Sequence, residues 1–145
     1  MKITLVAGGL LKSGPLKSLF QDYEKRLSWK IDVKEIPENA GSKTTKLFID
    51  KIPKGSVVIA LDETGDNLSS ASLAQFIQTK QVSGTSHFCF LIGTADGFSP
   101  EIHKHTHKKI SFGAATWPHL MVRTLLMEQL YRAQQIIAGH PYHRG

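Results

Sequence analysis

The chain has 145 residues, of which 41% are hydrophobic and 21% charged, and this composition is typical of one globular domain spanning residues 1–145. No stretch approaches the roughly 18 apolar residues of a membrane helix, and a single cysteine, Cys89, excludes an intrachain disulfide framework and fits a reducing cytoplasm. The net charge is +6, and residues 101–145 carry six Lys or Arg against two Glu, together with six of the seven histidines. This distribution fits a polyanionic partner such as nucleic acid, and it fits a solvated basic face equally well.

Apolar runs rich in β-branched or aromatic residues alternate with segments whose apolar residues have helical spacing. In chain order they predict a strand at 3–6, a helix at about 15–27, a strand at 31–36, a helix at about 42–52, a strand at 56–61, a helix starting at Ser69 or Ser70, and a strand at 87–92. The first run imitates a signal peptide, but Gly8 and Gly9 interrupt it and no cleavage site follows, so a buried strand is predicted. The alternation predicts an α/β fold with a parallel sheet, and the last two strands are apolar enough to be covered on both faces.

The last predicted helix begins near Pro118 and ends at about Ala138, since proline is tolerated in a first helical turn. Its predicted core stripe consists of Val122, Leu126, Leu130, Ala133 and Ile137. Further apolar residues beside this stripe leave two alternatives open, a terminal helix packed on its own sheet or a helix that also contacts a second subunit; they are Met121, Leu125 and Ile136.

Two nucleotide-binding patterns are disfavoured. Gly9 and Gly14 have the spacing of a phosphate-binding loop, but Pro15 and Leu16 stand where Lys and Ser or Thr are needed. A G-x-G-x-x-G motif after the first strand is also missing. Nucleotide hydrolysis and nicotinamide chemistry therefore lose most of their support.

Three alternating histidines, His103, His105 and His107, form a possible metal site. Neighbouring lysines add positive charge, and no Cys or Asp close in sequence completes a ligand set. We interpret them as a solvated patch that can face RNA, and we predict no metal.

Three segments are candidates for the edge where open α/β sheets bind ligands: a polar turn and a glycine-containing loop that follow predicted strands, and a small-residue loop just before the last helix. They are the segments at 61–65, 93–97 and 113–116. The last two could clasp an adenosine through backbone contacts, with Leu61 or Trp117 as an apolar wall. For residues 61–65 alone, a plain polar turn is an equal alternative.

Several of these motifs occur together and in order over nearly the whole chain. On their basis the sequence resembles the ribosomal RNA large-subunit methyltransferase H family of the SPOUT superfamily. The motifs are Leu61-Asp62-x-x-Gly65 with Ser69-Ser70, Leu91-Ile92-Gly93-x-x-x-Gly97, Trp117-Pro118-His119-x-x-x-Arg123, Glu128-Gln129-x-Tyr131-Arg132-Ala133 and His140-Pro141-Tyr142-His143-Arg144.

The resemblance implies a SPOUT fold with a C-terminal trefoil knot, a homodimer, and S-adenosylmethionine (SAM) as cofactor. The implied product is an N3-methylated pseudouridine in large-subunit (23S) ribosomal RNA, made on the assembled ribosome. The implied cofactor positions are Leu61, Gly93, Thr94, Gly113, Ala114, Ala115, Thr116, Trp117 and Pro118. Family members usually have a second glycine where this chain has Thr94. A threonine with positive φ would be strained, so either the backbone there is ordinary or this loop is shifted.

The chemistry of the implied reaction suggests the catalytic residues. The imide N3 of pseudouridine carries a proton, so catalysis must stabilise the deprotonated base and align it with the donated methyl group. The candidates are Arg132, Tyr142, His143 and Arg144, which in a dimer could reach the partner's cofactor, while a base or water takes the proton. His119 is a weaker candidate, because near a helix start it can simply cap or orient the loop. The alternative from another class is a non-catalytic RNA-binding factor in ribosome assembly on the same scaffold, which only the departure at Thr94 favours.

Overall fold

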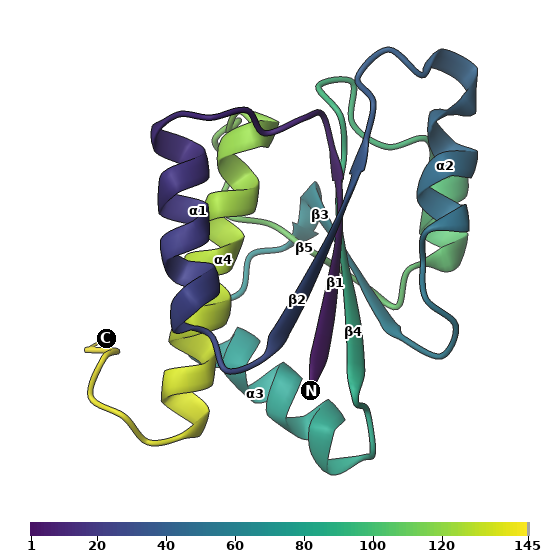
Figure 1. Cartoon of the computed structure of the whole chain (residues 1–145). Coiled ribbons are helices and arrows are strands. Elements are labelled where there is room, and N and C mark those ends of the chain that lie inside the picture. The colour runs from purple at the N-terminus through teal and green to yellow at the C-terminus, as the bar shows by residue number, and fades with distance from the viewer. Residues whose placement is uncertain (145) are drawn as a thin grey trace.

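The computed structural model describes residues 1–144 and shows a five-stranded sheet with helices on both faces (Figure 1). All strand pairs are parallel, and their order is β2-β1-β4-β3-β5. The strands are β1 (Lys2–Gly8), β2 (Lys30–Ile36), β3 (Val57–Asp66), β4 (His87–Ile92) and β5 (Lys108–Ile110). The α-helices are α1 (Pro15–Arg26), α2 (Thr44–Asp50), α3 (Ser70–Val82) and α4 (His119–Ile137), and two 3₁₀ helices are η1 (Gly41–Lys43) and η2 (Pro100–His105).

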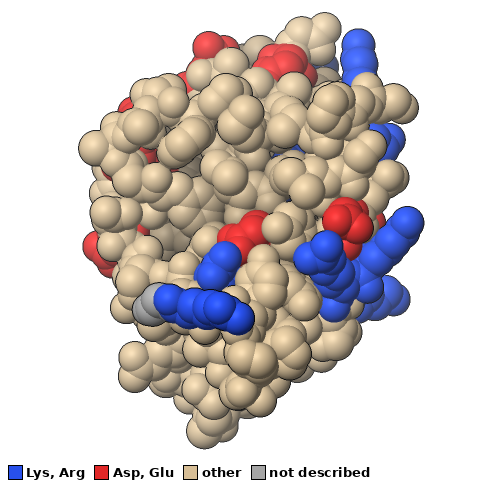
Figure 2. Space-filling view, turned by 90° about the vertical axis from the view of Figure 1, so that its left-hand side faces the viewer, with Lys and Arg blue, Asp and Glu red and all other residues tan. Residues whose placement is uncertain are grey.

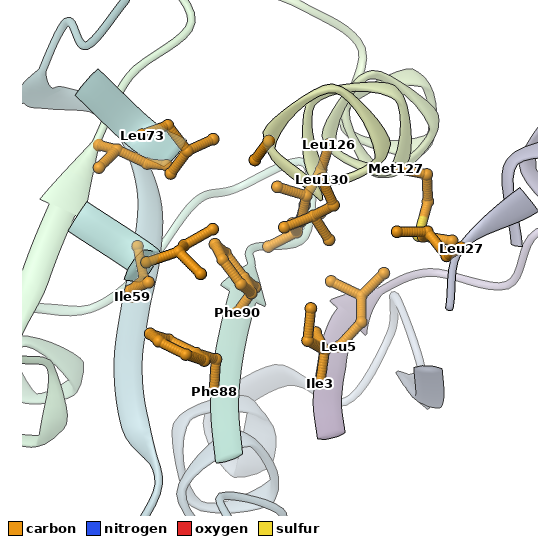
Figure 3. Close-up of a cluster of buried hydrophobic side chains, with 14 of the residues drawn as sticks. Ile3, Leu5, Leu27, Ile59, Leu73, Phe88, Phe90, Leu126, Met127 and Leu130 are labelled. Carbon is orange, nitrogen blue, oxygen red and sulfur yellow. The ribbon is translucent and has the colours of Figure 1, made fainter. Parts of the chain in front are cut away.

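The sheet separates two apolar cores, and its central strand β4 contributes alternate side chains to each. Phe88 and Phe90 face the side of α1, α3 and α4, and Phe90 lies near Leu126 and Leu130 of α4 (Figure 3). Cys89 faces the other core, which α2 and η2 cover. The thiol of Cys89 is fully buried, and this burial raises its pKa to about 12, so it is an unreactive small apolar side chain, as the sequence predicts.

The structure confirms the predicted parallel α/β fold and most of its elements. The predicted helix at 42–52 is wrong in detail, because η1 and α2 divide it. Two elements were not predicted: β5 has three residues, two of them lysines, and η2 contains the histidines from 103 to 105. Neither segment has an apolar run or a helical repeat that a pattern could detect. The trefoil knot stays a prediction.

Residues 61–65 are not the polar turn that the sequence allowed, since β3 continues through them to Asp66 with an irregular register against β5. Gly65 makes this continuation of β3 beside β5 possible, because it has no Cβ atom. A Cβ atom at this position would lie 2.6 Å from the backbone nitrogen of Ile110, far closer than real Cβ contacts. The glycine therefore lets β3 and β5 approach closely, and the position of β5 in turn determines where the segment that joins β5 to α4 starts.

A buried arginine fastens α4 to the carboxyl ends of β1 and β2. Arg123 is 1% exposed and donates to Glu35 Oε2 at 2.6 Å and to the carbonyls of Gly8 and Gly9 at 3.1 and 3.0 Å. Glu35 also accepts a hydrogen bond from the N–H of Leu11 at 2.8 Å. Partial burial opposes ionisation of Glu35, but these donors outweigh it and lower its pKa below the ordinary 4.5.

We expect Arg123→Met to lower the free energy of unfolding by about 3 kcal/mol, since the variant leaves two carbonyls and a carboxylate without their donor. Urea denaturation at pH 7 measures the loss. A group whose folded pKa is lowered stabilises the fold above its unfolded pKa, and that contribution is lost as the pH falls through the folded value. The stability difference between wild type and Glu35→Gln should therefore shrink as the pH falls below 4.5 and vanish once Glu35 is protonated in the folded protein; a difference that does not change with pH would contradict the ion pair's role.

Candidate functional site

A cavity of about 670 Å³ opens at the carboxyl edge of the sheet, between the ends of β3 and β4 and the segment that joins β5 to α4. This volume lies within the usual range for small-molecule sites. Eight of the nine predicted cofactor positions line the cavity: Leu61, Gly93, Thr94, Gly113, Ala115, Thr116, Trp117 and Pro118. Ala114 is exposed and is not part of the lining.

The loop after β4 forms one wall and is tightly folded. The N–H of Gly97 donates to the carbonyl of Thr94 at 2.9 Å, and Gly97 has a φ of 76°. Within residues 1–144 every residue with positive φ is a glycine, so Thr94 has ordinary backbone geometry. This settles the question raised by the sequence: the threonine does not strain the loop. A Cβ atom on Gly8 would lie 2.5 Å from the Thr94 nitrogen, so the end of β1 supports this wall directly.

The segment before α4 forms the opposite wall. Gly113 has a φ of 99°, and its carbonyl accepts a hydrogen bond from the Ser111 hydroxyl at 2.8 Å. The indole N–H of Trp117 donates to the Phe112 carbonyl at 3.2 Å, which fixes a ring that is 44% exposed. Pro118 is the N-cap of α4, so the positive end of a 19-residue helix lies beside the cavity.

Glu38 connects the two walls. It lies after β2, its carboxylate contacts His119 Nε2 at the start of α4, and it accepts a hydrogen bond from the Ala95 N–H at 3.4 Å. His119 itself lines the cavity. This geometry agrees with the non-catalytic role that the sequence allowed for His119, which is to orient a loop. Sequence analysis missed Glu38, because it lies in an irregular segment more than 50 residues from both partners.

The predicted catalytic residues gather around a different carboxylate, that of Glu128. Arg132 donates from Nε and Nη2 to Glu128 Oε1 at 2.9 and 2.5 Å, and the Tyr142 hydroxyl donates to the same oxygen at 3.3 Å. Arg132 Nη1 lies 3.0 Å from His143 Nδ1. The tail thus folds back onto α4, while Arg144 is exposed.

The Glu128 carboxylate also determines protonation in this cluster. Its hydrogen bonds raise the pKa of Arg132, which stays cationic. Burial, a hydrogen bond with Tyr23 and the negative charge of Glu128 raise the pKa of Tyr142 to about 12. At neutral pH Tyr142 is therefore a hydrogen-bond donor and not a base.

The structure does not bring the two predicted sets together within one chain. Arg132, Tyr142, His143 and Arg144 are not part of the cavity lining. Arg132 follows His119 by 13 residues of continuous helix, which corresponds to about 20 Å along the axis. Figure 1 shows the tail at the far end of α4 from the segment that begins it.

The three alternating histidines keep the solvent exposure that the sequence predicted, since His105 and His107 are exposed and the His103 side chain is 33% exposed, but two of them also have partners within the chain. His103 Nε2 lies 3.7 Å from Asp62 Oδ2, and the His107 ring accepts a hydrogen bond at Nδ1 from the Val58 N–H at 2.8 Å. Only His105 is exposed without either role. Among residues 1–144 no three His, Cys, Asp or Glu side chains are grouped to hold a metal ion. The sequence did not predict these partners, because it did not predict β5, which brings this segment against β3.

The chain matches a family model described as "Predicted SPOUT methyltransferase" over residues 1–143. The chain belongs to the SPOUT methyltransferase family.

Relatives named "Ribosomal RNA large subunit methyltransferase H" match this SPOUT methyltransferase over nearly its full length. The one from Rhodospirillum centenum is 40% identical and the match covers 100% of both chains; the one from Sphingopyxis alaskensis is 42% identical over 99% of this chain and 97% of its own. A crystal structure of Archaeoglobus fulgidus Nep1 bound to S-adenosylhomocysteine aligns with a TM-score of 0.41 at 16% identity, over 63% of this chain and 38% of that one. None of the helices formed by residues 1–144 has the length and apolar character that crossing a bilayer requires.

Methyltransferases of this family use SAM as the methyl donor. The lining of the cavity fits such a group. Backbone walls and the Trp117 ring suit a flat adenine, and the carboxylates of Asp62, Glu63 and Asp96 suit a sulfonium and an ammonium. The pKa of Asp62 is lowered: burial opposes ionisation, but hydrogen bonds from Thr64 and the charges of His103 and Lys109 outweigh it, so this carboxylate is anionic.

We expect Glu38→Gln to raise the Kd for SAM about three- to tenfold, because the variant loses the charge that holds His119 and the loop at 93–97 together. Isothermal titration calorimetry measures the change. Asp50→Asn is a matched control, since it removes the acid of a surface ion pair with Lys46 on α2, across the sheet. Equal Kd values for wild type and Glu38→Gln would contradict the connection between the walls.

Proposed function

We propose that this SPOUT methyltransferase transfers the methyl group of SAM to N3 of a pseudouridine in large-subunit (23S) ribosomal RNA, on the assembled ribosome in the cytoplasm. A single domain over residues 1–145 would carry the activity as a homodimer. The observation that supports the substrate most strongly is the match with relatives named ribosomal RNA large subunit methyltransferase H over the full length of both chains. The RNA is also the kind of polyanion that the charge of +6 favours.

The cavity and the cluster around Glu128 would have different roles in the reaction, the first binding SAM and the second acting on the pseudouridine. Bound SAM would supply an electrophilic methyl group, held by the backbone walls of the cavity and proposed positions such as Gly93 and Gly113. The pseudouridine must lose its N3 proton before N3 can accept the methyl group. Arg132, kept cationic by Glu128, would stabilise the resulting negative charge. Tyr142 would turn its hydroxyl from Glu128 to donate a hydrogen bond to the base, and a water molecule, or His143 once its Nδ1 is released by Arg132, would take the proton.

In a homodimer the tail cluster of one chain could lie beside the cavity of the other chain, although the two are far apart within one chain. If a two-fold axis crosses α4 at Leu125, the two copies of α4 lie antiparallel and residue 125+n of one faces 125−n of the other. Arg132 then faces the partner's Pro118, at the wall of the partner's cavity. Met121 and Leu125 are half-buried apolar residues on α4, and Leu125 lines a second recess of about 550 Å³ beside Trp117. These residues are the surplus apolar surface that sequence analysis assigned to the protein's own sheet or to a second subunit.

The non-catalytic alternative has no remaining support, because Thr94 has ordinary backbone geometry in a cavity of suitable size. Mass mapping of ribosomal RNA from cells that lack the protein tests the proposal. We expect one missing methyl group on a pseudouridine, restored by the wild-type gene. An unchanged methylation map would refute the proposed substrate.

A further inference from the structure

Helix α1 contributes aromatic and cationic side chains to the cluster that holds the tail. The Tyr23 ring of α1 lies 6.1 Å from the ring of Tyr131, and the Tyr131 ring lies 4.8 Å from the ring of Tyr142 in the tail. We call Tyr23, Tyr131 and Tyr142 the tyrosine row. It joins α1, α4 and the tail into one surface, although its members come from opposite ends of the sequence.

Arg26, in the last turn of α1, lies on this row. Its guanidinium carbon is 5.4 Å from the Tyr23 ring centre and 5.9 Å from that of Tyr131. The Arg26 side chain is nevertheless 48% exposed, and its ion pair with Asp22 is long, at 3.4 Å. Exposed pairs of this kind stabilise a fold by at most about 1 kcal/mol. The guanidinium therefore lies over two aromatic rings and is still about half exposed, so it remains accessible to a ligand.

The surroundings of Arg26 hold several cations, together with the carboxylates of Asp22 and Glu128. Figure 2 views the molecule from the side of α1, α4 and the tail, and Lys and Arg side chains lie in a band just below its middle, with patches of Asp or Glu among them. Lys25 is exposed next to Arg26, and Arg144 is exposed in the tail. At the other end of the tyrosine row, Arg132 lies 5.0 Å from the Tyr142 ring centre. Cations held on aromatic rings are a recurrent surface for nucleic acid, since phosphates pair with the cations and bases stack on rings.

We propose that Arg26 binds a backbone phosphate of the substrate RNA, with the tyrosine row holding its guanidinium in place. This inference rests on the proposed function and extends it to α1, which the predicted site residues do not include. A guanidinium suits the role because its planar fork matches two phosphate oxygens while its face stays stacked on the rings. Arg26 and Arg132 would then hold one RNA segment at two points, Arg26 on the backbone and Arg132 at the reacting base.

The test uses the complete protein with saturating SAM and assembled ribosomes from cells that lack it, at constant Mg²⁺. We expect Arg26→Ala to weaken ribosome binding about three- to tenfold and to lower the slope of log Kd against log salt concentration by about 0.7–0.9, the value for one phosphate contact. The KM for ribosomes should rise while kcat stays unchanged, because a phosphate contact binds ground state and transition state equally. Arg26→Lys should keep the salt slope and lose part of the affinity, since lysine keeps the charge but not the stacked fork.

Lys46→Ala is the matched control, because Lys46 is also a helical cation in an i,i+4 pair with an acid but lies on α2. It should change neither the affinity nor the slope. A salt slope in Arg26→Ala equal to that of wild type, with SAM binding intact by calorimetry, would overturn the inference and leave the proposed function standing. A wild-type protein that binds SAM but no ribosomes would overturn both. Arg26→Lys with full wild-type affinity would remove the role of the tyrosine row.

Discussion

Arg132→Ala is expected to lower kcat for ribosomal RNA methylation by about 100- to 1,000-fold, as is typical when the group that stabilises a developing negative charge is removed. SAM binding should remain close to wild type, because Arg132 does not line the cavity. Single-turnover methyl transfer with a radiolabelled donor measures the rate, and calorimetry measures SAM affinity. Arg132→Lys should recover little, since lysine cannot reproduce the geometry with which Arg132 contacts both Glu128 and His143.

Deleting the tail from Tyr142 onward is the companion variant and should abolish turnover while sparing SAM binding. The truncated chain retains Arg132 and Glu128, so it separates the contribution of the tail from that of the helix. Wild-type turnover by this truncated protein would reject any catalytic role of the tail.

Leu125→Glu is expected to convert the proposed dimer into a monomer and to abolish turnover, because the cavity and Arg132 then stay about 20 Å apart. Analytical ultracentrifugation and the methylation assay measure the two effects. Val82→Glu is the matched control, since Val82 is an apolar helical residue, 84% exposed, on α3. An active monomer would contradict the composite site.

Mixing two inactive variants gives a second and independent test of this arrangement. Arg132→Ala keeps an intact cavity, and Thr94→Trp, which fills the cavity, keeps an intact Arg132. If each site combines the two chains, random exchange produces heterodimers with one complete site each, and activity should recover to about a quarter of wild type. If each chain carries its own complete site, the mixture stays inactive.

Much of the fold could be predicted from the sequence, because the buried strands are long apolar runs. Phe88 to Ile92 have no polar position, and a strand covered on both faces has this pattern. β5 could not be predicted in the same way. Its position depends on Gly65, which permits close approach to β3, and such a contact between distant segments leaves no local periodicity.

The candidate site likewise has parts that could be predicted from the local sequence and parts that could not. Its glycine-rich walls follow strands and could be located from the sequence. The side chains that fix them could not, since Glu38 and Arg123 act on residues far away in the chain. Arg123 also illustrates a limit of pattern analysis: its side chain is charged yet buried, and its distant partners, the Glu35 carboxylate and the carbonyls of Gly8 and Gly9, explain this.

The position of β4 between β1 and β3 has a consequence for synthesis of the chain. β1 and β3 share no hydrogen bonds, so when they have left the ribosome each still exposes an unpaired edge. These edges become paired only after residues 87–92 have emerged and inserted between them. Until then β1 exposes the edge that pairs with β4, and β3 exposes both of its edges because β5 emerges later still, so this is the interval in which chaperone protection would matter most.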